Sequence, residues 1–144
     1  MAKPKKAKPS DSQTIISLEQ KLPEVPGRDP YSLPTMYLEK DGKGGYVIVP
    51  SRRPSKTLLV EEIRKEVDNW RESGYKKPAG ISSTSLRLLE WWFDETHFFK
   101  EGEEFKYYFA QREAIETIIY LYEVKRFRDA ADLIFKYIDP RAYS

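Results

Sequence analysis

The stretch YFAQREAIETIIYLYEVK, residues 108–125, decides the fold. Its apolar side chains recur mostly three and four positions apart, the spacing that brings side chains to one face of an α-helix. They are Phe109, Ala114, Ile115, Ile118, Ile119 and Tyr122. We predict a helix over residues 108–125 whose broad apolar face is mostly buried against other helices.

Three more segments have helical spacing. The first covers 57–72, where an apolar stripe is followed by Gly74 as a stop signal. The stripe consists of Leu59, Ile63, Val67 and Trp70. The second starts at the hydroxyl side chains of 82–84, which can cap a helix, and continues to about residue 94. The last covers 128–137 and ends before Asp139-Pro140.

The N-terminal part differs in composition from these helices. Eight of the ten prolines precede residue 55, and 17 of the 20 aromatic residues follow residue 57. Proline fixes φ and removes an amide donor, so residues 28–56 are predicted to be extended. Within them a glycine-rich turn at 42–45 separates residues 36–38 from 46–49, which favours a short β-hairpin. Residues 1–27 are basic and proline-rich and are predicted to be a disordered tail.

The predicted fold class is therefore mainly α. It is a small bundle of about four helices within residues 57–144, and the proline-rich extended segment with its short hairpin precedes this bundle.

Composition excludes several classes of protein. The chain has no cysteine and one histidine, so disulfide scaffolds, thiolate metal sites and ordinary zinc sites are ruled out. Mean hydropathy is −0.69, and no apolar run approaches the roughly 20 residues that cross a bilayer. We expect a cytoplasmic protein without a metal. Residues 57–144 carry 14 basic and 17 acidic side chains, so the helical part is mildly acidic.

The sequence predicts no catalytic residue. A phosphate-binding loop G-x-x-x-x-G-K-[ST] is absent from these 144 residues, and Gly42-Lys43 fails the pattern because residue 37 is tyrosine. The carboxylates of 101–104 and His97 lack neighbours that would separate their pKa values for acid–base chemistry. We interpret them as a solvated polar loop.

Gln111 is the candidate binding residue. It lies in the first turn of the predicted helix, directly after the aromatic residues Tyr107–Phe109. A carboxamide carries both a donor and an acceptor, so it can pair with the N6 and N7 edge of adenine, and an aromatic ring can cover the face of the base. The alternative is a solvated glutamine beside aromatic residues of the core.

The run FAQREAIET, residues 109–117, closely resembles the Q-motif region that opens the motor of superfamily-2, DEAD-like helicases of the type III restriction enzyme Res-subunit kind. The likeness continues upstream in order and spacing, and it covers residues 30–123. Its other segments are residues 30–35, 52–55, 70–75 and 81–92.

This resemblance implies an adenine-binding role. Gln111 would read the adenine of ATP, and Phe109 or Tyr108 would line the base pocket. The resemblance also implies a parent protein that acts on DNA, with a methyltransferase subunit as a further partner.

The sequence departs from that family at one decisive point. Its 144 residues contain neither a Walker A loop nor an acidic magnesium box. Because these groups hold the phosphates and magnesium, we expect the chain alone not to hydrolyse ATP. It is expected to be the N-terminal portion of such a helicase, which contributes adenine recognition to a downstream motor.

Two other functions stay open at this stage. One is a small helical adaptor that docks on a partner protein through the exposed aromatics Trp91, Trp92, Phe98 and Phe99. The other is a nucleic-acid-binding module that uses the cations Lys3, Lys5, Lys6, Lys8, Arg52 and Arg53. The net acidity of the helical part makes the second less favoured.

Overall fold

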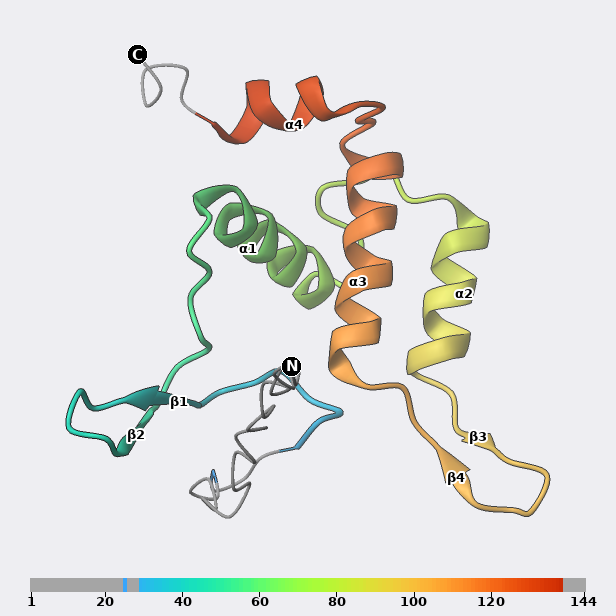
Figure 1. Ribbon diagram of the computed structural model, residues 1–144. Coiled ribbons are helices and arrows are strands. Elements are labelled where there is room, and N and C mark those ends of the chain that lie inside the picture. Colours follow the sequence, from blue (N-terminus) through green and yellow to red (C-terminus); the bar gives the residue numbers. More distant parts are fainter. Residues whose placement is uncertain (1–24, 26–28, 139–144) are drawn as a thin grey trace, which may run out of the picture.

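The computed structural model describes Val25 and residues 29–138 (Figure 1). In chain order the elements are β1 (Tyr37–Lys40), β2 (Tyr46–Val49), α1 (Leu58–Glu72), α2 (Ser83–Phe93), β3 (His97–Phe98), β4 (Glu104–Phe105), α3 (Phe109–Ile119), the π-helical segment η1 (Tyr120–Val124) and α4 (Ala130–Tyr137). The prediction of a mainly helical fold with a short hairpin ahead of four helices is confirmed. The predicted tail, apart from Val25, and the predicted stop at Asp139-Pro140 lie outside the described residues.

Helix α3 occupies the centre of the fold (Figure 1). Helix α1 contacts one side of it, α2 runs alongside the other, and α4 lies across its C-terminal end. Both sheets are two-stranded and antiparallel, and β1–β2 stands away from the helices. The largest fully buried side chains are Trp70, Tyr120, Leu89, Glu116 and Val67.

Helix α1 forms as its sequence pattern predicts. Ile63, Val67 and Trp70 are buried on one stripe, and the helix ends two residues before Gly74, whose φ is +65°. Tyr75 follows with φ +62°, a strained conformation for a residue with a Cβ. Its ring is held edge-on to Trp70 at 4.9 Å, so packing stabilises this turn.

Helix α2 begins at the predicted cap. The Ser82 hydroxyl accepts a hydrogen bond from the Ser85 amide at 3.1 Å, which satisfies a free N–H of the first turn. The Glu123 carboxylate accepts from the Ser82 amide and the Ser85 hydroxyl, both at 2.7 Å. The start of α2 is thereby bound to the end of the α3–η1 helix.

The prediction of which residues of α3 are buried is partly wrong. Ile118 is 68% exposed and Tyr122 is 57% exposed, whereas Glu116 is completely buried. A count of apolar residues favours Ile118 for the interior. The actual rotation of the helix is set by the partners of the Glu116 carboxylate.

Three side chains donate hydrogen bonds to Glu116. Arg71 Nε donates to Oε2 at 2.8 Å, while Arg112 Nε and the Tyr75 hydroxyl donate to Oε1 at 2.9 and 2.6 Å. Arg71 also donates to Asp68 at 2.7 Å. Burial and the Glu116 carboxylate raise the pKa of Tyr75 well above its usual value, so its hydroxyl stays a donor. The buried charge is thus both paired and hydrogen-bonded, as a buried carboxylate requires.

A second carboxylate fastens α4. Glu66 Oε2 of α1 accepts from the Tyr137 hydroxyl at 2.7 Å, the Tyr120 hydroxyl at 3.0 Å and Lys125 Nζ at 2.8 Å. Residues five apart point to different faces of an α-helix, but the wider π turn brings them toward one side. This explains the π geometry of η1, because both Tyr120 and Lys125 reach Glu66.

The β3–β4 hairpin was not predicted. His97 pairs with Phe105 and Phe98 with Glu104, so residues 101–103 of the predicted polar loop form its turn. Two-residue strands are too short for a period-2 pattern to reveal them. Within the described residues, no helix is both long and apolar enough to cross a membrane.

We predict that Glu116→Gln lowers the free energy of unfolding by about 3 kcal/mol, because it leaves Arg71 and Arg112 without their buried counter-charge. Urea denaturation followed by circular dichroism measures this loss. Glu72→Gln changes an exposed carboxylate and should shift stability by less than about 0.5 kcal/mol. Equal effects of the two substitutions would contradict a structural role for Glu116.

Glu66 gives a pH-dependent prediction. Burial raises the pKa of this carboxyl, but hydrogen bonds from Lys125, Tyr137 and Tyr120 outweigh burial and hold the pKa below its usual 4.5. A pKa lowered by folding stabilises the protein above about pH 4.5, and this stabilisation is lost as the pH falls below that value. The stability difference between wild type and Glu66→Gln should therefore shrink between pH 7 and pH 3.

Unfolding free energies measured across this pH range check the prediction. Glu90→Gln, at an exposed position of α2, is the matched control. A difference between wild type and Glu66→Gln that stays constant with pH would show that the charge of Glu66 does not anchor α4.

Candidate functional site

The candidate site is the N-terminal end of α3, where the proline-rich segment, residues 29–38, contacts the helix. The Phe109 amide donates to the Pro30 carbonyl at 2.9 Å. The rings of Tyr31 and Tyr108 stack with their centroids 5.3 Å apart and their planes 12° from parallel. An extended segment far away in the sequence is thus fixed against the first turn of this helix.

Gln111 is exposed on this first turn. Its carboxamide oxygen accepts a hydrogen bond from the Tyr108 amide at 2.9 Å, so the side chain caps its own helix. A carboxamide oxygen has two lone pairs, and the NH2 group has two hydrogens. The cap uses one lone pair, and the second lone pair and the NH2 group can still meet the edge of a base.

The two candidate aromatics have different surroundings. Phe109 is buried, with the guanidinium groups of Arg71 and Arg52 at 5.0 and 5.7 Å from its ring centroid. Tyr108 is 51% exposed and directly linked to Gln111 through the capping bond. The ring of Tyr108 is the more exposed of the two, and Phe109 lines the pocket beside this end of α3.

Two further residues of the Q-motif-like run bind the chain's own fold. Arg112 donates to Glu116 and, through Nη2, to the Tyr75 hydroxyl at 2.8 Å. Glu113 forms an ion pair with Arg52, from the segment that follows β2. Arg112 and Glu113 therefore fix the position of α3, and Gln111 is the exposed polar residue beside them.

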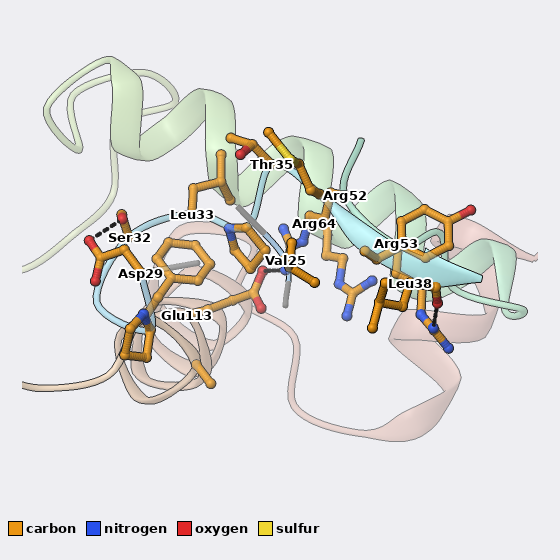
Figure 2. A pocket seen from close by; sticks show the side chains of 16 residues that line it. Val25, Asp29, Ser32, Leu33, Thr35, Leu38, Arg52, Arg53, Arg64 and Glu113 are labelled. Carbon is orange, nitrogen blue, oxygen red and sulfur yellow. Dashed lines mark hydrogen bonds and ion pairs between the residues drawn. The ribbon is translucent and has the colours of Figure 1, made fainter. Parts of the chain in front are cut away.

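A pocket of about 720 Å³ lies next to this end of α3 (Figure 2). Much of its wall is the proline-rich segment, and Phe109, Ala110 and Glu113 contribute from the helix. Figure 2 shows the bond from Arg52 to Glu113 and the bond from Ser32 to Asp29. The charged groups of Arg52, Glu113 and Asp29 thus already have partners within the chain. The Ser32 hydroxyl and the Tyr31 amide lower the pKa of Asp29.

Sequence reasoning missed this pocket, because its lining combines residues 29–38 with Arg52, Arg64 and the start of α3, which are far apart in the sequence. Gln111 does not line it and faces solvent at the same end of the helix. The pocket and the candidate adenine-reading edge are thus adjacent but separate features.

The polar loop has no arrangement for acid–base chemistry. A ring nitrogen of His97 lies 2.5 Å from the Trp91 carbonyl oxygen, and Glu104 pairs with Lys106 at 3.3 Å. Among residues 29–138 no group of three or more histidine and carboxylate side chains could hold a metal ion.

The residues of the other two candidate functions are partly accessible. Trp91, Phe98 and Phe99 are 49%, 65% and 52% exposed, whereas Trp92 is half-buried. Arg52 forms ion pairs with Asp68 and Glu113, and Arg53 is exposed. The candidate lysines Lys3, Lys5, Lys6 and Lys8 lie outside the described residues.

Comparison with family models, with curated proteins and with solved structures finds no match to this chain. The resemblance to helicases therefore stays a prediction from the sequence.

Proposed function

We propose that this chain is the N-terminal portion of a DEAD-like, type III restriction-type ATP-dependent helicase and that Gln111 contributes adenine recognition to the motor. The observation that carries the proposal is the placement of Gln111. It lies on the solvent side of the first turn of α3, beside the exposed ring of Tyr108, with a donor and an acceptor available.

The segments that carry the resemblance meet around α3, which supports the proposal. Pro30 and Tyr31 contact the start of the helix, Arg52 pairs with Glu113, and Arg71 binds Glu116. A likeness dispersed over residues 30–123 thus belongs to one packed unit. This is the arrangement expected if the likeness reflects a shared structural module.

The exposed face of α3 offers a surface for the motor. Gln111, Ala114, Ile118 and Tyr122 are all exposed and are spaced three, four and four residues apart. They form a stripe with Gln111 at its N-terminal end and the apolar residues toward its C-terminal end. A motor that covers the apolar part of this stripe would bring its bound nucleotide toward Gln111.

Adenine recognition by this chain alone would be too weak to detect. Two hydrogen bonds contribute roughly 0.5 to 1.5 kcal/mol each, and the phosphates of ATP need a Walker A loop and magnesium. We therefore propose no catalytic activity for these 144 residues by themselves. DNA and a methyltransferase subunit would be partners of the parent protein.

Gln111→Glu tests the adenine role separately from the cap. A carboxylate still accepts from the Tyr108 amide, but it cannot donate to adenine N7. In a protein that joins this chain to its motor, we expect the KM for ATP to rise about tenfold and the preference for ATP over GTP to be lost. Steady-state ATPase assays with both nucleotides measure this.

Stability measurements complete that test. Gln111→Glu should leave the melting temperature unchanged, whereas Gln111→Ala should lower stability by about 1 kcal/mol because it also removes the cap. Unchanged ATP kinetics in both variants would exclude Gln111 from adenine recognition.

Ile118→Lys tests the docking of the motor. Ile118 is 68% exposed, so the substitution should change stability by less than about 0.5 kcal/mol while weakening association with a separately expressed motor at least about tenfold. Leu58→Lys is the matched control, because Leu58 is 66% exposed and lies at the start of α1. Isothermal titration calorimetry measures both affinities, and equal weakening would contradict docking along α3.

The second candidate function is a helical adaptor, favoured by the exposed rings of Trp91, Phe98 and Phe99. The coding DNA that follows codon 144 distinguishes the two functions at little cost. A Walker A motif in that DNA supports the helicase, and an unrelated gene supports the adaptor.

A further inference from the structure

The β1–β2 hairpin is an uncovered two-stranded ribbon. Its strands are four residues long, and Figure 1 shows it set apart from the helices. Tyr46, Val47 and Ile48 are 37%, 47% and 40% exposed. An isolated hairpin is at best marginally stable in water, so a ribbon that exposes these side chains gains stability when another surface covers it.

The tip of the ribbon has a defined shape. The Asp41 carboxylate accepts from the amides of Lys43 and Gly45 at 2.7 and 2.8 Å, and the Asp41 amide donates to the Gly45 carbonyl at 3.1 Å. Gly42 and Gly44 have φ of +74° and +90°, which side chains with a Cβ rarely adopt. The one carboxylate at the tip is therefore turned into the loop, and the lysines beside it are exposed.

The ribbon and its base carry cations without acidic partners. Within the part of the chain that the structure describes, four exposed cations here form no ion pair with a carboxylate: Lys40, Lys43, Arg53 and Lys56. Residues 57–138 carry 13 basic and 16 acidic side chains, and several of the basic ones form ion pairs: Arg64, Lys65, Arg71, Arg112 and Lys125. Residues 37–56 carry five basic side chains and two acidic ones, Glu39 and Asp41, so this part of the chain is net positive whereas the helical part is net negative.

Lys40 and Lys43 lie toward the tip of the ribbon, and Arg53 lies at its base, on the opposite face of β1 from Lys40. The Arg53 guanidinium lies 5.1 Å from the Tyr37 ring centroid and donates to the Leu38 carbonyl, which fixes it against β1. Lys40 is directly opposite Tyr46 in the strand register, so a cation and an aromatic ring share one face of the ribbon. Lys43 lies beyond them in the loop.

We propose that the β1–β2 ribbon binds double-stranded DNA, with Lys40, Lys43 and Arg53 on phosphates and Tyr46 against sugar or base edges. A two-stranded ribbon fits the major groove of B-DNA, whereas the major groove of A-form RNA is too narrow for it. Phosphate neutralisation gives such a contact its affinity. This inference goes beyond the adenine role of Gln111 and needs no ATP.

The test uses the full 144-residue chain and a fluorescein-labelled 20-base-pair DNA duplex. Fluorescence anisotropy at 50 to 200 mM NaCl gives the affinity and its salt dependence. The double substitution Lys40→Ala with Lys43→Ala should weaken binding at least about tenfold at 50 mM salt. It should also make the slope of log K against log salt shallower by about 2, since two phosphate contacts are lost.

The matched control is Lys76→Ala with Lys77→Ala, which removes two exposed lysines from the loop between α1 and α2. This pair should leave both affinity and slope unchanged. Tyr46→Ala should weaken binding without changing the slope, because it removes no charge. Far-UV circular dichroism confirms that each variant is folded.

Four results would overturn the proposal. The first is no binding of the wild-type chain to the duplex at 50 mM salt. The second is equal weakening by the ribbon and control substitutions, which would indicate a diffuse charge effect. The third is tighter binding of single-stranded DNA or duplex RNA of the same length than of duplex DNA. Deletion of residues 1–10 measures the contribution of the basic tail, and binding lost on deletion but retained without Lys40 and Lys43 also excludes the ribbon.

Discussion

The fold depends on a buried carboxylate, that of Glu116. Removing a charge from water costs several kcal/mol, and this cost is offset only if donors of good geometry surround it. The donors come from α1, from the turn after α1 and from α3 itself, as Arg71, Tyr75 and Arg112. Because all three must reach one carboxylate, α3 has a single rotation relative to α1. That rotation determines which residues of α3 face solvent.

The outward face of α3 is therefore a consequence of the ion network on its inward face. With Glu116 inside, Ile118 is exposed although it is apolar, and Gln111 stays accessible at the start of the same helix. The ion pair between Glu113 and Arg52 extends the network to the segment after β2. The inward residues give the fold its geometry, and the outward residues are free for a partner.

Local sequence patterns predicted the features that depend on neighbours in the chain. The apolar stripe of α1, the stop at Gly74, the cap at Ser82 and the first hairpin all belong to this group. Patterns of hydrophobicity could not identify Glu116 as interior, because its partner Arg71 is 45 residues away along the chain. The π turn and the pocket beside α3 likewise depend on tertiary contacts. The exposed position of Gln111 follows from the same helix rotation, so the sequence could propose its chemistry but not its accessibility.

The capping bond of Gln111 is compatible with the proposed adenine contact and would assist it. A free glutamine side chain loses rotamer freedom when it binds a base, and this loss reduces affinity. In this fold the Tyr108 amide already holds the carboxamide oxygen, so much of that ordering takes place when the helix forms. The second lone pair and the NH2 group are then presented by a side chain of fixed orientation. Helix capping and adenine recognition would thus use the same ordered conformation, and neither would have to be broken for the other.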